Sequence, residues 1–290
     1  MVSRFIALEI ACVCGLAAIA DTARAEGIQF PGTRPLGTGG AMRAFATGDA
    51  GPMLNPSGIS LIRTYQVEGA YQYGNLRDSN DARFSAVDST SGLNIGGALF
   101  YQYHHDSQAG LSQTGQLGGG SLSFPIADKI FLGGSAKYLH FIDAAGALKT
   151  GFNFDAGLTI RPMPQFSIGA VAYNLRDLGI TWAPKAYGGG VAIMPMPALI
   201  FVFDIVAQDV PGHDSAVYYM GGGEFSFSTS AALRAGGGSD GLSKNGYITA
   251  GLSGISASIG SLDVGFRQDV SGATKSTIVG VSARLFVPSM

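Results

Sequence analysis

The sequence predicts an all-β fold, a transmembrane barrel of antiparallel, up-and-down strands. The chain of 290 residues is 46% hydrophobic and only 13% charged, which is too apolar for an ordinary soluble domain. The best internal candidate for a spanning helix, VAIMPMPALIFVFDIVAQ, is interrupted by Pro195, Pro197 and Asp204. High apolar content without long apolar runs is typical of a barrel, because only every second residue of its strands meets lipid.

The N-terminus has the pattern of an export signal. Arg4 gives a positively charged start, the apolar stretch FIALEIACVCGLAAIA follows, and an A-x-A cleavage motif ends at Ala25. We therefore expect residues 1–25 to be a signal peptide that is cleaved after about Ala25. Both cysteines, Cys12 and Cys14, fall inside it, so disulfide, metal-thiolate and cysteine-nucleophile chemistry are excluded from the mature chain. Export without disulfides indicates a bacterial cell envelope, and a barrel indicates its outer membrane.

Alternation of apolar and polar residues is clearest in three segments. YQVEGAYQYGN begins at Tyr65, GLNIGGALFYQYH begins at Gly92, and FNFDAGLTIR begins at Phe152. Because successive side chains of a strand point to opposite faces, each segment has one apolar and one polar side. The segments are about ten residues long, which is the length that a tilted strand needs to cross a bilayer. Aromatic residues such as Tyr71 and Tyr101 lie near their ends, as in an interfacial girdle.

About fourteen such strands follow one another from Tyr65, an even number as bacterial barrels require. The expected strands are 65–76, 80–88, 92–104, 113–125, 128–142, 149–161, 165–174, 184–194, 197–208, 214–227, 229–239, 244–255, 257–269 and 274–287. Twelve strands would remain if the hairpin that contains 80–88 did not form. Tight connections alternate with longer polar ones, which predicts periplasmic turns and outer loops. The segment 104–113 is one of the expected outer loops.

Charged residues fall on the polar face of the expected strands. The predicted lumen residues are Glu68, Lys137, Asp155, Arg161, Asp204, Glu224, Arg234, Asp263, Arg267 and Arg284. Since both signs occur, we expect paired charges and not an ion funnel of one sign. Structural salt bridging and a specific polar substrate site are the two interpretations of this set.

Residues 26–64 precede the first strand and are too polar and too rich in glycine to span a membrane. We expect them to fold back into the lumen as a hatch or plug, with the barrel formed by residues 65–290. Gly-Gly-Gly occurs inside expected strands at 118–120, 188–190, 221–223 and 236–238. Glycine lets another backbone approach closely, so some of these residues are predicted to accommodate the plug. The alternative is that they help the sheet to curve.

The segment GTRPLGTGGAMRAFATGDAGPMLNPSGIS resembles the N-terminal signature of the FadL/PorV-like outer-membrane barrels, a superfamily that includes transporters of fatty acids and other hydrophobic compounds. The matching residues are Gly37, Gly39, Gly40, Ala41, Asp49, Ala50, Asn55, Pro56, Ser57 and Gly58, with Ser57 in place of the usual alanine. The resemblance implies a fourteen-stranded barrel with an N-terminal hatch. In the fatty-acid transporters, hydrophobic ligands are caught by long outer loops and leave through a wall gap in the third strand. Gly96 and Gly97 lie in the third expected strand and mark the candidate gap; a plain glycine-rich strand is the alternative.

Two functions remain open at this stage. One is passage of small, mainly hydrophobic solutes across the outer membrane, as the signature implies. The other is a PorV-like docking barrel that anchors a secretion or motility complex, which the absence of any loop longer than about a dozen residues favours. The expected partners are accordingly outer-membrane lipid and either a hydrophobic solute or envelope-complex proteins.

Other functions find little support in the sequence. We expect no enzyme, because no catalytic cluster emerges, and no cofactor or metal. His104-His105-Asp106 falls in an expected solvated loop, and no further histidine is placed to complete a metal site. The formal charge of −2 and the scattered basic residues argue against nucleic acid.

Overall fold

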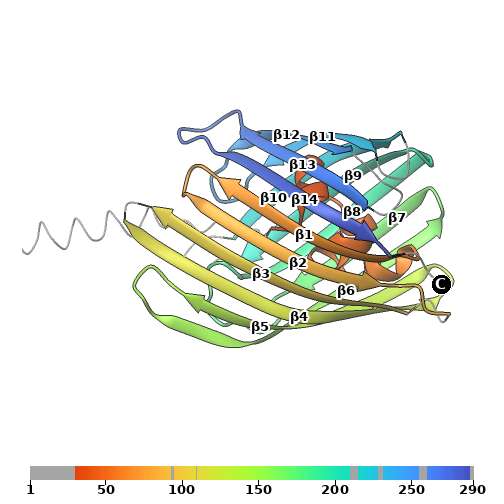
Figure 1. The fold of residues 1–290 in the computed structure, drawn as a ribbon, viewed down its shortest axis with the longest axis horizontal. Helices are drawn as coiled ribbons and strands as arrows, with labels where there is room; N and C mark the ends of the chain where they lie inside the picture. Colours follow the sequence, from red (N-terminus) through yellow and green to blue (C-terminus); the bar gives the residue numbers. More distant parts are fainter. Residues whose placement is uncertain are drawn as a thin grey trace, which may run out of the picture.

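A closed antiparallel β-barrel surrounds the N-terminal part of the chain in the computed structural model (Figure 1). The structure describes residues 30–92, 95–108, 110–209, 215–227, 231–254 and 260–287. The predicted signal peptide and its cleavage site lie outside this part of the chain. Each strand pairs with the next one along the sequence, and the first strand pairs with the last, which closes the cylinder. The predicted up-and-down topology is therefore confirmed.

The wall contains fourteen strands within the described residues. They are β1 Tyr65–Gly74, β2 Ser79–Asp88, β3 Gly96–Gln108, β4 Leu111–Ala127, β5 Ile130–Ile142, β6 Leu148–Met163, β7 Phe166–Tyr173, β8 Lys185–Met196, β9 Leu199–Asp209, β10 Ala216–Ser226, β11 Ala232–Ser239, β12 Gly246–Gly254, β13 Gly260–Asp269 and β14 Thr277–Phe286. Because β2 pairs along its length with both β1 and β3, the alternative of twelve strands is wrong.

The two ends of the barrel differ in their connections. At the end where the chain enters β1 and leaves β14, the turns after β4, β6 and β8 are each two residues long. We call this the turn end. The opposite end is the loop end, and it carries residues 174–184 between β7 and β8, the longest connection between consecutive strands of the described chain.

The expected loop at 104–113 is wrong, because β3 and β4 extend through it and stay paired. The polar residues of this segment suggested that it is exposed to solvent. The inward-facing His104 and Asp106, however, have polar partners inside the lumen. His104 lies beside Asp81, and Arg77 binds Asp106. A strand with a polar inner face therefore continues beyond the point where the sequence resembles a loop.

Outward-facing side chains form an apolar surface along the strands. On β9, for example, Phe201, Phe203 and Ile205 are exposed, whereas Val202 and Asp204, which alternate with them, are buried. A surface of this kind is matched to the hydrocarbon of a bilayer, in which a closed sheet leaves no backbone group without a partner. Within the described residues, no helix is long and apolar enough to cross a membrane.

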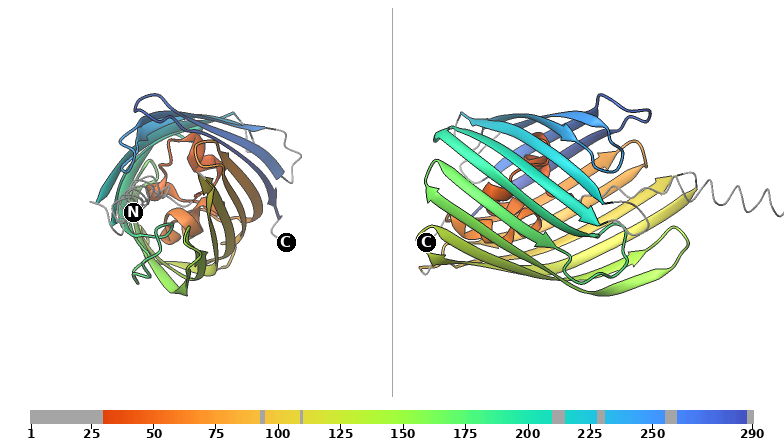
Figure 2. Two further views of the ribbon diagram at one scale, coloured as in Figure 1. Left: turned by 90° about the vertical axis from the view of Figure 1, so that its left-hand side faces the viewer. Right: turned by 180° about the vertical axis from the view of Figure 1, so that it is seen from behind.

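The N-terminal segment lies inside the barrel, as the end-on view shows (Figure 2, left). It contains the short helices α2 Thr33–Gly37, η1 Arg43–Phe45, η2 Gly48–Ala50, α3 Gly51–Leu54 and η3 Pro56–Leu61. Almost every residue from Phe30 to Ser60 is buried. We call residues 30–64 the plug, and its place in the lumen agrees with the prediction.

Glycines of the wall make room for the plug. A Cβ atom on Gly222 would lie 2.7 Å from the carbonyl oxygen of Thr38, and one on Gly236 would lie 2.7 Å from the amide nitrogen of Gly39. A Cβ atom on Gly188 would meet the Arg43 side chain at 3.0 Å. Three of the four glycine triplets thus accommodate the plug, as predicted. In the fourth triplet, the Cβ position of Gly119 meets the wall strand β5.

Candidate functional site

A continuous network of ion pairs fastens the plug to one side of the wall. It joins Arg34, Arg83, Arg234 and Arg284 to Asp49, Glu68, Glu224 and Asp263. The plug contributes Arg34, whose guanidinium lies 2.8 Å from Glu224, and Asp49, which lies 3.2 Å from Arg284. The remaining members come from β1, β2, β10, β11, β13 and β14, so the network also bridges the β1–β14 seam. Four cations face four anions, which leaves no net charge when all are ionised.

The ionisation of Asp49 depends on this network. Burial by itself would raise the pKa of the Asp49 carboxyl. The attraction of Arg284, and after it that of Arg83, outweighs burial and holds this pKa below its usual range. Asp49 therefore remains a carboxylate at neutral pH in spite of being 2% exposed.

Further pairs fix other parts of the lumen. Asp204 accepts hydrogen bonds from the backbone amides of Met42 and Arg43 at 2.8 and 2.9 Å, and the Arg43 guanidinium lies 3.1 Å away. Lys137 lies 2.8 Å from Asp155. These pairs fit the structural interpretation of the lumen charges, because each carboxylate is occupied by a partner of the protein itself.

The two remaining predicted lumen residues lie toward the ends of the barrel. Arg267 pairs with Asp240 and Asp269 at the loop end, and its guanidinium lies 3.8 Å from the centre of the Tyr247 ring. Arg161 lies near the turn end, where its guanidinium covers the ring of Phe45 at 5.6 Å.

The signature residues of the plug form its contacts with the wall. Gly39 and Gly40 adopt positive φ angles of 77° and 84°, which favour glycine, and the Gly39 carbonyl accepts a hydrogen bond of 2.8 Å from the Tyr247 hydroxyl. The Asn55 side chain accepts from the Ser57 amide at the start of η3 and donates to the Arg43 carbonyl at 2.9 Å. Pro56 begins η3. Gly37 lies against β12, where a Cβ atom would be in tight contact with Gly251 at 3.1 Å, and Gly58 lies against Ala46 of the plug, where a Cβ atom would collide.

Gly96 and Gly97, the candidate wall gap, lie at the start of β3. Gly97 pairs with Asp88 of β2 and with Leu122 of β4, and Gly96 pairs with Ser123 of β4; neither ladder shows a register shift here. A Cβ atom on Gly96 would lie 2.5 Å from the Ile59 side chain of η3. The glycine at position 96 therefore makes room for the plug, and a wall gap at Gly96 and Gly97 stays a prediction.

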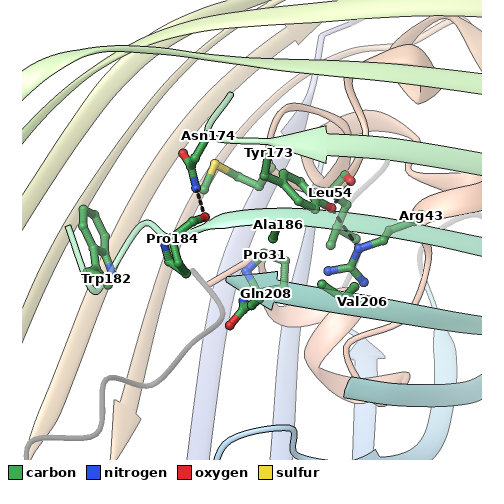
Figure 3. A pocket seen from close by; sticks show the side chains of 11 residues that line it. Pro31, Arg43, Leu54, Tyr173, Asn174, Trp182, Pro184, Ala186, Val206 and Gln208 are labelled. Atoms are coloured by element: carbon green, nitrogen blue, oxygen red, sulfur yellow. Dashed lines mark hydrogen bonds between the residues drawn. The ribbon is translucent and has the colours of Figure 1, made fainter. Parts of the chain in front are cut away.

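Residues 174–184 fold into the lumen from the loop end, and we call them the lid. The side chain of Asn153 on β6 binds the Arg176 backbone twice, accepting from its amide at 3.0 Å and donating to its carbonyl at 2.8 Å. The Lys149 ammonium donates to the Gly179 carbonyl at 2.6 Å. At the base of the lid, the Asn174 side chain donates to the Pro184 carbonyl at 2.8 Å (Figure 3). These bonds hold the lid across the lumen.

Beneath the lid, one side of the lumen is apolar. Its members are Phe100, Leu117, Leu139 and Phe141 of β3, β4 and β5, Ile180, Trp182 and Ala183 of the lid, and Met53 of the plug. We call this group the apolar chamber. The alternation along these strands predicts a polar inner face and does not indicate this group. The available signal was the run of large apolar residues that share the inner face with Gln102 and His104 on three consecutive strands.

His104 belongs to this region and is not a residue of a solvated loop, contrary to the prediction. It is 4% exposed, and its Nδ1 atom lies 3.0 Å from a carboxylate oxygen of Asp81. Its ring stacks on Trp182 with 5.2 Å between centroids and an interplanar angle of 11°. The described residues contain no group of three side chains that could hold a metal ion.

A small cavity of about 40 Å³ lies between the lid, the plug and the wall (Figure 3). Trp182 and Pro184 border it on the lid side, and Leu54 borders it on the plug side. Arg43 donates a hydrogen bond of 2.8 Å to the Tyr173 hydroxyl at its edge. This volume holds a few water molecules. The side chains of the apolar chamber are packed and buried, so the lumen is closed at this point in the described conformation.

The chain was compared with known proteins by sequence and by structure. No family model matches it, and no curated protein is similar enough in sequence to count as a relative. Solved structures do match. The CymD monoaromatic hydrocarbon channel superposes with a TM-score of 0.69 at 11% identity, over 89% of this chain and 97% of that one. The chain has a FadL-type fold.

Two further structures support this assignment. The toluene transporter TbuX of Ralstonia pickettii has a TM-score of 0.67 at 12% identity and covers 91% of this chain and 99% of its own. A FadL homologue of Pseudomonas aeruginosa has a TM-score of 0.65 at 11% identity, over 89% of this chain and 99% of that one. The predicted FadL-like architecture is confirmed at the level of the fold. Within this FadL-type barrel, the chamber lies between the plug on one side and the lid on the other.

Proposed function

We propose that the chain is a bacterial outer-membrane channel for small hydrophobic solutes. The observation that carries this proposal is the apolar chamber, which faces the lumen from β3, β4 and β5, on other strands than those that supply the ion-pair network. A hydrophobic solute gains free energy by leaving water for such a surface, and ions do not. The neighbours of the same fold include a monoaromatic hydrocarbon channel and a toluene transporter, which agrees with this proposal.

The solute path runs along β3, β4 and β5. A solute that enters at the loop end meets the lid first, then Leu117 and Leu139 of the wall, and finally Met53 of the plug. Passage therefore requires both the lid and the plug to move, since the side chains of the chamber are packed against one another and buried in the described conformation. Conversely, the ion-pair network lies on the other side of the lumen and fastens the plug there.

The docking function is not favoured. A barrel that only anchors an envelope complex has no need of an apolar wall inside its lumen, because a buried polar lining or a filled core would serve equally well. The structural neighbours are named as channels and a transporter, which also argues against an enzyme.

Uptake into vesicles tests the proposal. Because toluene crosses phospholipid readily, the vesicles need an outer leaflet of lipopolysaccharide, and labelled toluene is expected to enter faster when the protein is present. Leu139→Asn is expected to lower this rate about fivefold or more, since a polar group buried in the chamber costs roughly 1–3 kcal/mol. Leu148→Asn, an exposed residue at the loop end, is the matched control and leaves the rate unchanged. Equal rates with and without protein, together with a protein that co-purifies from the envelope, would instead favour docking.

A further inference from the structure

Three residues that lie side by side on neighbouring strands form a slot at the loop end of the chamber. His104 of β3 pairs with Gly115 of β4, and Gly115 pairs with Phe141 of β5. All three face the lumen, so two rings flank a position that carries no side chain. The result is a narrow space with a ring on each side and a glycine as its floor.

The indole of Trp182 fills this slot. Its plane is within 11° of the His104 ring and within 12° of the Phe141 ring, with centroid separations of 5.2 and 6.5 Å. Both separations are in the range of aromatic pairs. A Cβ atom on Gly115 would lie 2.6 Å from the indole, so any other residue at this position would close the slot.

The walls of the slot are held rigidly while its occupant is not part of the wall. His104 is fixed in its orientation by the bond to Asp81, and Phe141 is 1% exposed within a paired strand. Trp182 comes from the lid, whose described hydrogen bonds to β6 involve Asn174, Leu175, Arg176 and Gly179 and so lie at earlier residues of the lid. The lid can therefore release the indole without breaking the sheet.

We propose that the slot between His104 and Phe141 is a binding subsite for one flat aromatic ring of the solute, and that Trp182 occupies it as an internal substitute in the closed state. This inference rests on the proposed function and names the class of solute. An incoming ring replaces the stacking contacts that the indole loses, so the exchange is nearly balanced and the lid opens without a large cost. The released site leads directly to Leu117 and Leu139 of the chamber.

The shape of the slot selects flat rings over puckered ones. A saturated ring carries axial hydrogen atoms on both faces and is too thick to take the place of an indole that is parallel to both walls. It also lacks the π-electron faces that make stacking on the His104 and Phe141 rings favourable. Toluene and methylcyclohexane share one carbon skeleton and differ in this respect, which makes them a matched pair of probes.

Trp182 is the only tryptophan of the chain, so its fluorescence reports on the slot directly. With purified full-length mature protein in detergent, toluene is expected to shift the emission to longer wavelength and to increase quenching by acrylamide several-fold, in a saturable manner. Methylcyclohexane at the same concentration in the micelle is expected to change neither the emission wavelength nor the quenching by acrylamide. Equal responses to the two probes, or no response to toluene, would overturn the assignment of the slot.

A glycine pair in β4 supplies the variants. Gly115→Val fills the slot and is expected to expose the indole without any toluene and to abolish the further response to it. Gly118→Val in the same strand is the control, because a Cβ atom there lies 3.7 Å from the nearest side chain, an ordinary contact. An indole that stays buried in folded Gly115→Val protein would contradict the proposal. The wild-type measurement decides the question if this variant does not fold.

Uptake separates this inference from the proposed function. If toluene exposes Trp182 but does not enter vesicles, the slot stands and the proposed transport falls. If toluene enters vesicles while Trp182 remains buried, transport stands and the slot is wrong.

Discussion

Arg284→Met is expected to destabilise the barrel by about 3–5 kcal/mol, the range found when one partner of a buried ion pair is removed. Arg284 lies on β14 and contacts Asp49 of the plug at 3.2 Å, Glu68 of β1 at 3.2 Å and Asp263 of β13 at 3.5 Å. Its loss leaves four carboxylates facing three guanidinium groups in a region with little exposure. The excess negative charge falls at the seam where the first and last strands meet, so both barrel closure and plug attachment weaken.

The free energy of unfolding, measured by guanidinium titration in detergent micelles, checks this prediction. Arg63→Met is the matched control, because Arg63 is exposed at the turn end, and its loss is expected to change stability by less than about 1 kcal/mol. The double variant Arg284→Met with Glu68→Gln restores equal numbers of charges and is expected to recover part of the lost stability. If Arg284→Met unfolds at the same guanidinium concentration as Arg63→Met, the network does not fasten the plug and the seam.

The strands could be predicted because their signal is local. A membrane barrel requires the same alternation of inward and outward side chains on every strand. The period of two by itself therefore predicts that Leu99 is exposed to lipid and that the next residue, Phe100, is buried in the lumen. Closure of β1 on β14 followed from the requirement that no strand edge remains open in hydrocarbon. The glycines of the wall indicated a second layer inside, since a strand tolerates so many only where another backbone comes close.

The candidate site could not be predicted in the same way because its signals are not local. The polar run around His104 resembles a loop until Asp81, which lies on the preceding strand, is seen to bind it. The importance of Gly115 becomes visible only when Trp182 of a distant connection lies on it. The alternation rule also treats the inner face as uniformly polar, and it therefore hides the apolar side chains that β3, β4 and β5 turn toward the lumen.

The lumen thus combines two surfaces with different tasks. Ion pairs from β1, β2, β10, β11, β13 and β14 fix the plug, and apolar side chains from β3, β4 and β5 line the path that the proposed function assigns to an uncharged solute. Breaking the plug away from the wall on the apolar side should therefore free it locally without disturbing the charged side. The glycines that accept η3 offer a way to do this.

Gly133→Val is expected to displace η3 from the wall. A Cβ atom on Gly133 would overlap the backbone of Pro56 and Ser57, and backbone atoms cannot move aside as a flexible side chain can. Ser57 is 0% exposed in the described conformation, and its carbonyl accepts a hydrogen bond of 2.9 Å from Ser123 of β4. The mature chain is predicted to contain no cysteine, so Ser57→Cys provides a single thiol that reports on this contact. In the Ser57→Cys protein, labelling of this thiol by a membrane-impermeant maleimide is expected to be very slow. When Gly133→Val is added, the labelling rate is expected to rise by orders of magnitude.

Gly134→Val is a closely matched control for this experiment. Gly134 is the next residue of β5, but it faces outward, and a Cβ atom there lies 3.7 Å from the nearest atom, the carbonyl oxygen of Asp155. Valine at this position adds the same volume and the same β-branch to the same strand, so any general effect on the sheet is shared between the two variants. If the thiol is labelled equally fast in both, the close approach of η3 to Gly133 does not hold the plug. If only Gly133→Val exposes it, the absence of a side chain at that one wall position is a requirement for the closed lumen.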